Sequence, residues 1–350
     1  MTLRVATSAR AFVNAPAATL VGPQALKLPA GSASASGALR SAALRDAADG
    51  PLSIGVLGEH SNPSVHNIAA AVQARGAVAH IIDLGDVQRG SSGLTLAGRP
   101  LPHMDLAIGY HGAEVPSGGM QVMRQLERDG VAFVNGPAGI RTSRDKWLAA
   151  QAFEKAGVLT PATRLARTGL EARAHAAELG MPVILKLRIG TEGKGVAKLS
   201  ELNEVAPVAD MVIAARRNML VQQMIQMRQP ADIRAFVVGD RVVAAMKRTV
   251  GENRTGDFRT NLSNSGSGVA IRLHPKDAAN AVRTAQALRL KVAGVDLMGD
   301  WGAMRTIEGN SGPGQKIREI TGVDVADEIA QLLVTDAQAA RSARLGGQGT

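Results

Sequence analysis

Cysteine is absent from the 350-residue chain, which excludes disulfide bonds, thiolate metal sites and cysteine nucleophiles. Aromatic residues make up only 2% of the chain, so its cores must be built from aliphatic side chains and methionine. The 45% hydrophobic content is ample for such cores. No run comes near the roughly 18 consecutive apolar residues that a membrane span needs. We therefore expect a soluble, cytoplasmic protein with no membrane partner.

Acidic side chains are missing from the first 45 residues, which contain five basic ones. Without these five the net charge falls from +10 to +5, with 35 basic and 30 acidic residues. This mild surplus suits anionic substrates such as nucleotides or acidic peptides. The chain has no basic run interleaved with aromatic side chains for base stacking, which argues against a nucleic-acid partner.

The two ends of the chain have the composition of flexible segments. Residues 1–50 are rich in Ala, Ser and Gly and predict a disordered extension, with an organelle transit peptide as the alternative. Residues 336–350 predict a flexible tail. Folded domains are expected over 51–139 and 140–335.

Strand-like and helix-like runs alternate through the first of these domains. Apolar runs at 52–58, 78–85, 104–110 and 131–135 predict buried strands, with a small excursion at 94–102 and helical patterns at 61–76 and 118–130. This alternation predicts a doubly wound parallel sheet in an α/β domain. His111 and Glu114 follow the third strand, at a carboxyl end where such sheets bind ligands, although a structural histidine is as common there.

The run from Lys291 to Gly314 predicts a β-hairpin that carries three oxygen-bearing side chains. Asp296 lies on its first strand, while Glu308 and Asn310 end the second strand, two residues apart and so on one face. Oxygen ligands with no nearby His or Cys suit Mg²⁺, which usually works with substrate phosphates. The alternative is a solvated hairpin edge with ordinary surface carboxylates.

Other segments of the second domain could hold anions. Lys146 lies in the first turn of a predicted helix, where a cation gains from a nearby anion. The glycine-rich loop 189–195 lets backbone N–H groups approach phosphates, with a plain hairpin turn as the alternative. The polar segment 249–268 is fit to hold phosphate or carboxylate oxygens, unless it is a solvated surface loop. The basic residues in and beside this segment are Lys247, Arg248, Arg254 and Arg259.

Six ordered stretches resemble the ATP-grasp superfamily and, within it, the RimK-like α-L-glutamate ligases. The similarity extends over about residues 52–334. Its most specific stretches are GRPLPHMDLAIG (98–109), RTSRDKW (141–147), VILKLRIGTEGKGV (183–196), ADIRAFVVGDRVVAAMKR (231–248), GDFRTNL (256–262) and VAGVDL…IEGNSGPG…ITGVDVADEI (292–329).

This resemblance implies a fold and a set of site residues. The implied fold is an N-terminal pre-ATP-grasp α/β domain at 51–139, followed by a two-lobed α+β ATP-grasp domain at 140–335 with the nucleotide between its lobes. By position, the implied nucleotide-binding residues are Lys146, Lys186, Gly190, Gly193, Gly195, Gln222, Gln223, Met224, Ile225, Asp232 and Arg234. The implied Mg²⁺ ligands, with Mn²⁺ as an alternative ion, are Asp296, Glu308 and Asn310, and the residues implied over the reacting groups are Arg259 and Asn261.

The implied activity is ATP-dependent ligation of a carboxylate to an amine through an acyl phosphate. We expect an acidic amino acid such as glutamate to be joined to a protein or peptide carboxylate. Ligation of small molecules and a non-catalytic nucleotide-binding regulator are the alternatives. Gln223 replaces a usual ribose-binding Glu, and SNSGSG (263–268) replaces a basic glycine-rich run, so nucleotide affinity and acceptor can differ. The sequence decides neither the acceptor nor whether the protein is a homo-oligomer.

Overall fold

The computed structural model describes residues 50–91, 93–112, 114–190, 195–215, 218–227, 231–249 and 268–346. All of these residues belong to one unit of the chain, Gly50–Thr350. The expected extension, apart from Gly50, lies outside the described residues, as do the predicted site residues Gly193, Arg259 and Asn261. None of the helices within these ranges has the length and apolar character needed to cross a membrane.

Four parallel strands form the N-terminal sheet, in the order β2-β1-β6-β7. Its alternation of strands and helices confirms the predicted α/β domain. Strand residues such as Ile54, Val56 and Ile108 are fully buried, as expected of a parallel sheet covered on both faces. Asn62 caps the first helix by accepting a hydrogen bond from the Ser64 N–H at 3.0 Å. The elements are β1 (Ser53–Leu57), α2 (Pro63–Ala74), β2 (Val78–Ile82), β6 (Leu106–Gly109), α3 (Gly119–Arg128) and β7 (Ala132–Val134).

The predicted excursion between the second and third parallel strands is a small antiparallel sheet of its own. Its three strands lie in the order β3-β4-β5. They are β3 (Val87–Gly90), β4 (Gly93–Leu96) and β5 (Arg99–Pro100).

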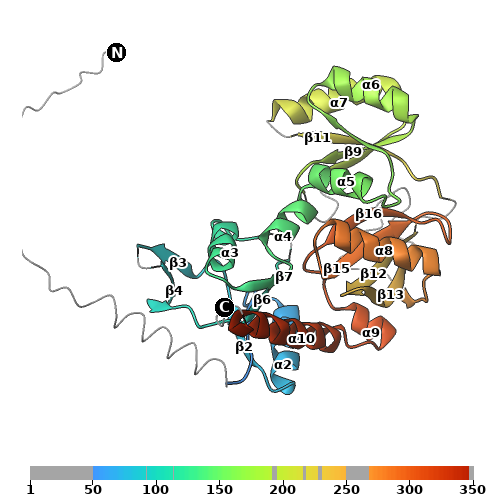
Figure 1. The fold of residues 1–350 in the computed structure, drawn as a ribbon. Helices are drawn as coiled ribbons and strands as arrows, with labels where there is room; N and C mark the ends of the chain where they lie inside the picture. The colour runs from blue at the N-terminus through green and yellow to red at the C-terminus, as the bar shows by residue number, and fades with distance from the viewer. Residues whose placement is uncertain are drawn as a thin grey trace, which may run out of the picture. The chain divides into compact units, whose positions relative to one another are not determined.

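An antiparallel sheet in the order β10-β9-β11-β8 forms the first lobe of the second region. Helices α6 and α7 lie together against this sheet (Figure 1). Val183, Leu185 and Val221 pack with these helices into a separate hydrophobic core. The elements are α4 (Pro137–Arg144), α5 (Lys146–Lys155), β8 (Thr163–Ala166), α6 (Gly169–Leu179), β9 (Val183–Leu187), β10 (Val196–Leu199), α7 (Leu202–Ala214) and β11 (Met219–Gln223).

A second antiparallel sheet, in the order β14-β13-β12-β15-β16, forms the other lobe. Helix α8 packs on this sheet (Figure 1), where Ala281 and Ala285 meet Val295 and Leu297 in one core. The predicted hairpin is present, because β15 and β16 pair antiparallel. The elements are β12 (Ala231–Val238), β13 (Arg241–Thr249), β14 (Gly268–Ala270), α8 (Pro275–Ala287), β15 (Val292–Met298), β16 (Arg305–Asn310) and α9 (Ile317–Thr321).

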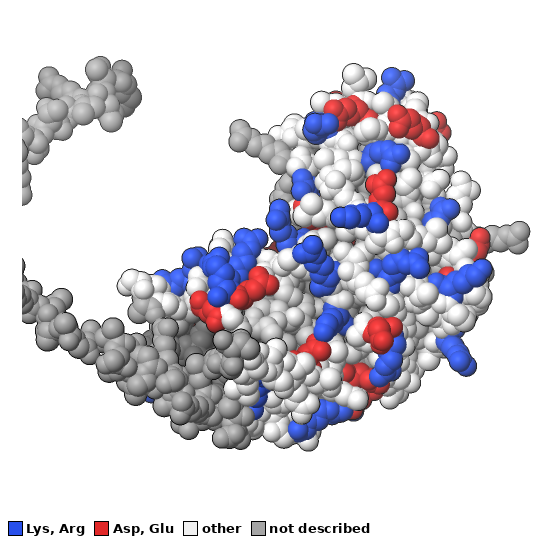
Figure 2. All heavy atoms as spheres, in the orientation of Figure 1, with Lys and Arg blue, Asp and Glu red and all other residues white. Residues whose placement is uncertain are grey.

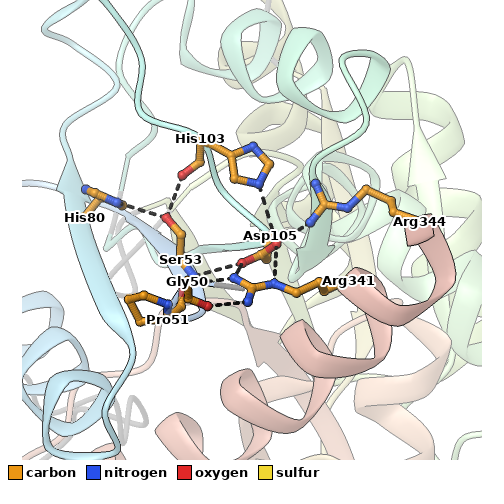
Figure 3. Close-up of polar contacts among 8 residues, drawn as sticks. All are labelled: Gly50, Pro51, Ser53, His80, His103, Asp105, Arg341 and Arg344. Atoms are coloured by element: carbon orange, nitrogen blue, oxygen red, sulfur yellow. Dashed lines mark hydrogen bonds and ion pairs between the residues drawn. The ribbon is translucent and has the colours of Figure 1, made fainter. Parts of the chain in front are cut away.

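The last helix, α10 (Val325–Gly346), corrects the prediction of a flexible tail from residue 336. It packs on α2 of the N-terminal domain (Figure 1), and Ala337 is fully buried in the core that includes β1 and β6. Further along the helix, Arg341 and Arg344 bind the buried carboxylate of Asp105 (Figure 3). Because Asp105 lies 236 positions before Arg341, the local composition of the helix could not reveal this contact.

Candidate active site

A cavity of about 880 Å³ brings together residues from α2, α4, α5, β9, β11, β12, β13 and β16. Basic side chains are spread over the face seen in Figure 2, with acidic ones between them. The cavity has a stronger excess of one charge, because its lining contains seven basic and two acidic side chains among the described residues, which favours anionic ligands. The basic ones are Arg144, Lys146, Lys186, Arg234, Arg248, Lys316 and Arg318, and the acidic ones are Glu308 and Glu319.

Lys146 lies at the first position of α5 and lines the cavity. Asp145 caps this helix, accepting from the Trp147 N–H at 3.0 Å, and it also pairs with the Arg188 guanidinium at 2.6 Å. The Lys146 Nζ donates to the Gly190 carbonyl at 2.5 Å. The first turn of α5 is thereby tied to the end of β9, which places this lysine at the edge of the glycine-rich loop.

Lys186 lines the same cavity from β9 and is half-buried. Burial lowers the pKa of its ammonium group to about 8, and the Lys146 charge acts in the same direction. The Glu308 carboxylate partly offsets both effects. Lys146 and Lys186 therefore place two positive charges near each other with little opposite charge around them. A bound polyanion would stabilise both charges.

The three predicted metal ligands lie on neighbouring positions of the β15–β16 hairpin. Asp296 stands directly opposite Glu308, and Asn310 Nδ2 donates to Glu308 Oε1 at 3.3 Å. Glu308 and Asn310 line the cavity, whereas Asp296 is only 2% exposed behind them. Two carboxylates and an amide oxygen therefore meet at one place on the sheet.

Asp296 is also bound by two arginines that line the cavity. Arg234, its cross-strand partner on β12, donates to it at 2.9 Å, and Arg248 of β13 lies 3.0 Å away. Burial opposes ionisation of Asp296, but the two arginines outweigh it and hold its pKa below the usual range. Arg248 in turn donates to Asp232 at 2.8 Å. Burial raises the pKa of Asp232 to about 6, although the bond from Arg248 acts against this.

The oxygen donors of this site fit a hard divalent cation such as Mg²⁺. Within the described residues, Glu308 forms no ion pair, so its carboxylate is available to a metal. The Asp296 carboxylate has further lone pairs beyond those that the arginines use. A set of three or more His, Cys, Asp or Glu side chains suited to a metal does not occur among the described residues, so the site would need Asn310 and phosphate oxygens to complete the coordination.

The segment predicted to contact adenine and ribose is placed only in part at the cavity. Gln222 is buried at the cavity wall and donates to the Thr163 hydroxyl at 2.9 Å. Gln223, Met224 and Ile225 follow it at the end of β11 but are not among the lining residues in the described part of the chain. The Gln223 side chain is instead 3.4 Å from Arg305 Nη1.

Of the remaining predicted residues, some line the cavity and others do not. Gly190 lines the cavity, while Gly195 closes the β9–β10 hairpin with a φ of +73° that favours glycine. Asp232 is buried beneath Arg248 rather than exposed to a ligand. His111 is 1% exposed, its ring nitrogens have no hydrogen-bond partner in the described residues, and burial lowers its pKa. Glu114 is exposed and outside the described cavity lining.

Sequence reasoning missed the contribution of the N-terminal domain to the cavity. Asn62, Ser64 and Asn67, at the start of α2, line it. The Asn67 amide donates to Gln315 Oε1 at 3.2 Å, across 248 positions of sequence. The only local signal was the capped start of α2, which by itself does not indicate a ligand.

Two family sequence models match consecutive parts of the chain. The RimK PreATP-grasp domain matches residues 52–140, and the RimK-like ATP-grasp domain matches residues 143–333. The chain belongs to the RimK-like ATP-grasp family. Members of this family are ATP-dependent ligases that form carbon–nitrogen bonds, and this RimK-like protein is therefore a ligase.

The matches to curated relatives of this ligase extend over nearly the whole length of those relatives. A probable alpha-L-glutamate ligase 1 of Shewanella denitrificans is 33% identical over 285 residues, which are 80% of this chain and 96% of the relative. A probable alpha-L-glutamate ligase of Cellvibrio japonicus is 34% identical over 293 residues, covering 81% of this chain and 95% of the relative. These matches confirm the resemblance seen in the sequence.

Solved structures confirm the ATP-grasp fold. The ATP-grasp ligase PsnB complexed with a minimal precursor has a TM-score of 0.64 at 18% identity and covers 81% of this chain and 99% of PsnB. The D-alanine–D-alanine ligase from Bacillus anthracis complexed with ATP has a TM-score of 0.60 at 16% identity and covers 85% of this chain and 100% of that enzyme. Identities this low show the fold alone.

Proposed function

We propose that this RimK-like ligase uses ATP and Mg²⁺ to join glutamate to a carboxylate of a protein or peptide. The observation that carries the proposal is one cavity lined both by several basic side chains and by the oxygen-bearing side chains of Glu308 and Asn310. The names of the curated relatives support glutamate as the amino acid. The complexes of PsnB with a precursor peptide support a peptide acceptor.

In the first step of this proposal, the acceptor carboxylate attacks the γ-phosphate of ATP and ADP leaves. Lys146 and Lys186 bind the phosphate oxygens, and Arg234 and Arg248 stabilise negative charge that develops on the transferred group. Mg²⁺ would supply further charge neutralisation at the phosphates, held by Asp296, Glu308 and Asn310. The protein acts here by positioning and electrostatics more than by covalent chemistry.

In the second step, the amine of the incoming amino acid attacks the acyl phosphate, an amide bond forms and phosphate leaves. Arg144 and Lys316 line the cavity besides the four cations assigned to the phosphates, and this surplus of basic side chains is left for a second anion. Burying a carboxylate is costly unless a cation is paired with it, and arginine pairs with carboxylates in bidentate geometry. The surplus therefore favours an acidic amino acid over a neutral one.

The test is a screen for phosphate release with ATP, Mg²⁺ and one amino acid at a time, with and without a peptide that ends in glutamate. We expect glutamate to give the fastest release, and mass spectrometry should show the peptide gaining the mass of glutamate. Equal release with neutral amino acids would contradict an acidic substrate. Release with free amino acids and no peptide product would instead support ligation of small molecules.

The metal ligands can be tested separately through Glu308. Glu308→Gln keeps the size of the side chain and removes the charge, so turnover should fall by roughly two orders of magnitude or more, the scale of losing one strong electrostatic contributor. Glu154→Gln, at an exposed residue of α5 outside the described cavity lining, is the matched control and should retain turnover. Near-normal turnover of Glu308→Gln with Mg²⁺, in a protein of unchanged melting temperature, would remove Glu308 from the metal site.

A further inference from the structure

Part of the cavity wall comes from residues outside the predicted nucleotide and metal groups. It combines the start of α2 with the segment that follows Asn310. Asn62 and Ser64 lie in the first turn of α2, so the positive end of that helix dipole is at the cavity. A ligase needs such additional space, because two substrates must bind beside the nucleotide.

Gln315 is the residue of this wall whose hydrogen bonding is incomplete. Its side chain is 8% exposed, and its Oε1 accepts a hydrogen bond from Asn67 Nδ2 at 3.2 Å. Its buried Nε2 has no hydrogen bond of good geometry within the described residues, although the Gln315 side chain is close enough to the Tyr110 hydroxyl to interact with it. The nearby Tyr110 hydroxyl donates to the Pro313 carbonyl. A buried donor without a partner is costly and is rare in folded proteins, so a ligand oxygen at this position would relieve the cost.

The charges beside Gln315 indicate that this oxygen belongs to an anion. Lys316 is exposed, lines the cavity and forms no ion pair in the described part of the chain. Arg144 lines the cavity from α4, and its Nη1 is 3.5 Å from the Gly112 carbonyl. Arg318 also lines the cavity but pairs with Asp324 at 3.0 Å. Among the described residues, Glu319 is the acidic side chain next to Lys316 in sequence, and Glu59 and Glu114 act on the charge of Arg144, so Lys316 is the cation that could pair with a bound anion.

We propose that Gln315 and Lys316 bind a carboxylate that does not react. This inference rests on the proposed function. An amino acid that enters as the amine keeps its own carboxylates, and an acidic peptide has carboxylates besides the one that is activated. These groups must be held away from the γ-phosphate, or they would be phosphorylated in place of the correct one. The amide donor and the ammonium group supply one hydrogen bond and one charge for this purpose.

The experiment compares Gln315→Leu and Lys316→Gln with wild type. Lys276→Gln, at an exposed lysine of α8 outside the cavity lining, is the matched control, and Lys316→Arg is the conservative variant. The KM values for ATP, glutamate and a glutamate-ended peptide are measured separately by phosphate release. Either cavity variant should raise the KM of one carboxylate substrate by about tenfold, with the KM of ATP changed by less than about twofold.

The two sources of the carboxylate give different results. A raised KM for glutamate places the incoming amino acid at this site, and a raised KM for the peptide places the acceptor there. Lys316→Arg should restore most of the affinity, and Lys276→Gln should match wild type. Unchanged KM values for both carboxylate substrates in both cavity variants would overturn the proposal. If Gln315→Leu fails to fold in a melting experiment, the surface variant Lys316→Gln decides.

Failure of the proposed function would be recognised first, as wild type that releases no phosphate with glutamate or peptide. The binding site is then tested by calorimetric titration of glutamate and of the peptide into the full chain with Mg–ADP. Binding to wild type that weakens about tenfold in Lys316→Gln would support the site without the reaction. No binding to wild type, or equal binding to wild type and variant, would overturn it.

Discussion

Lys186 shows how a single side chain of the site depends on residues distant in sequence. The alternation of VILKL predicted the strand that carries it, and β9 is that strand. Its pKa of about 8 could not be predicted from this pattern, because it results from burial, from Lys146 and from Glu308 on another sheet. The local pattern thus predicted the position of the lysine, and the tertiary structure determines its charge.

ATP binding should therefore weaken above pH 8. Lys186 is protonated below its pKa of about 8 and loses its positive charge as the pH rises through that value. The Kd of ATP should rise by up to about tenfold between pH 7 and pH 9, because the neutral amine no longer attracts phosphate. Calorimetry across pH 7–9.5 measures this, and Lys186→Arg, which stays charged, should remove the dependence. An affinity that stays flat to pH 9 in wild type would contradict it.

The hairpin that carries the three proposed metal ligands was predictable because its residues are close in sequence. Asp296 and Glu308 are opposite each other, as a hairpin over 291–314 requires. The arginine pairs were not predictable, because they depend on the register of three strands: β12 brings Arg234 next to Asp296, and β13 brings Arg248 next to Asp232. Asp232 consequently positions an arginine that lines the cavity.

Helix α10 illustrates the limit of composition at the scale of an element. Its last turns are rich in Ala, Arg and Gly and predicted a tail, yet they complete the N-terminal domain. Arg341 donates to the Gly50 carbonyl at 2.6 Å, to the Pro51 carbonyl at 2.9 Å and to Asp105 (Figure 3). Ser53 N–H also donates to Asp105 at 2.9 Å. The helix therefore ties the start of β1 to the strand that begins after Asp105.

Arg341→Ala should destabilise the fold much more than the loss of an exposed pair on the same helix. Asp105 is 1% exposed, and removing one partner of a buried pair costs about 3 kcal/mol, although Arg344 remains. Asp327→Ala removes the exposed pair with Arg75 and should cost about 1 kcal/mol or less. Urea unfolding of the two variants at pH 7 measures how much each loses in free energy of unfolding. Equal losses would contradict the stronger stabilisation expected of the buried pair.

The pairing of Arg341 with Asp105 also predicts how the stability difference between wild type and Arg341→Ala depends on pH. Burial acts against ionisation of Asp105, but Arg341 and the Ser53 N–H outweigh it and lower its pKa below the ordinary value. A carboxyl group with a lowered folded-state pKa contributes stability above its unfolded pKa of about 4 and loses it as the pH falls through the folded value. The stability gap between wild type and Arg341→Ala should therefore narrow below about pH 4.

The hydrophobic cores of the whole molecule do not follow the boundary expected at residue 139. Ile54 and Val56 of the N-terminal sheet share one core with Phe236 and Val238 of β12 and with α10. The lobe built on β8–β11 has a core of its own. The fold class was predictable from motifs, whereas this sharing of a core was not, because it depends on how the elements of the chain pack together.

Asn135 is the polar link across this shared core, so its loss should affect both sheets together. It is 2% exposed at the end of β7, and its amide donates to the Val292 carbonyl at 2.7 Å and the Ser311 carbonyl at 2.9 Å. Its Oδ1 accepts from the N–H groups of Lys291 and Val292. Asn135→Ala leaves these buried backbone groups without partners, at a cost of about 3 kcal/mol or more.

Hydrogen exchange measured by mass spectrometry can show whether the two sheets that share this core unfold as one unit or independently. In Asn135→Ala, amides of β1 and β6 should lose protection by about the same free energy as those of β12 and β15, because the core that they share opens as one unit. Amides of β9 and β11 should exchange as in wild type, since their core lies elsewhere. Loss of protection confined to β1, β6 and β7 would show that the two sheets unfold independently, in spite of the residues they bury together.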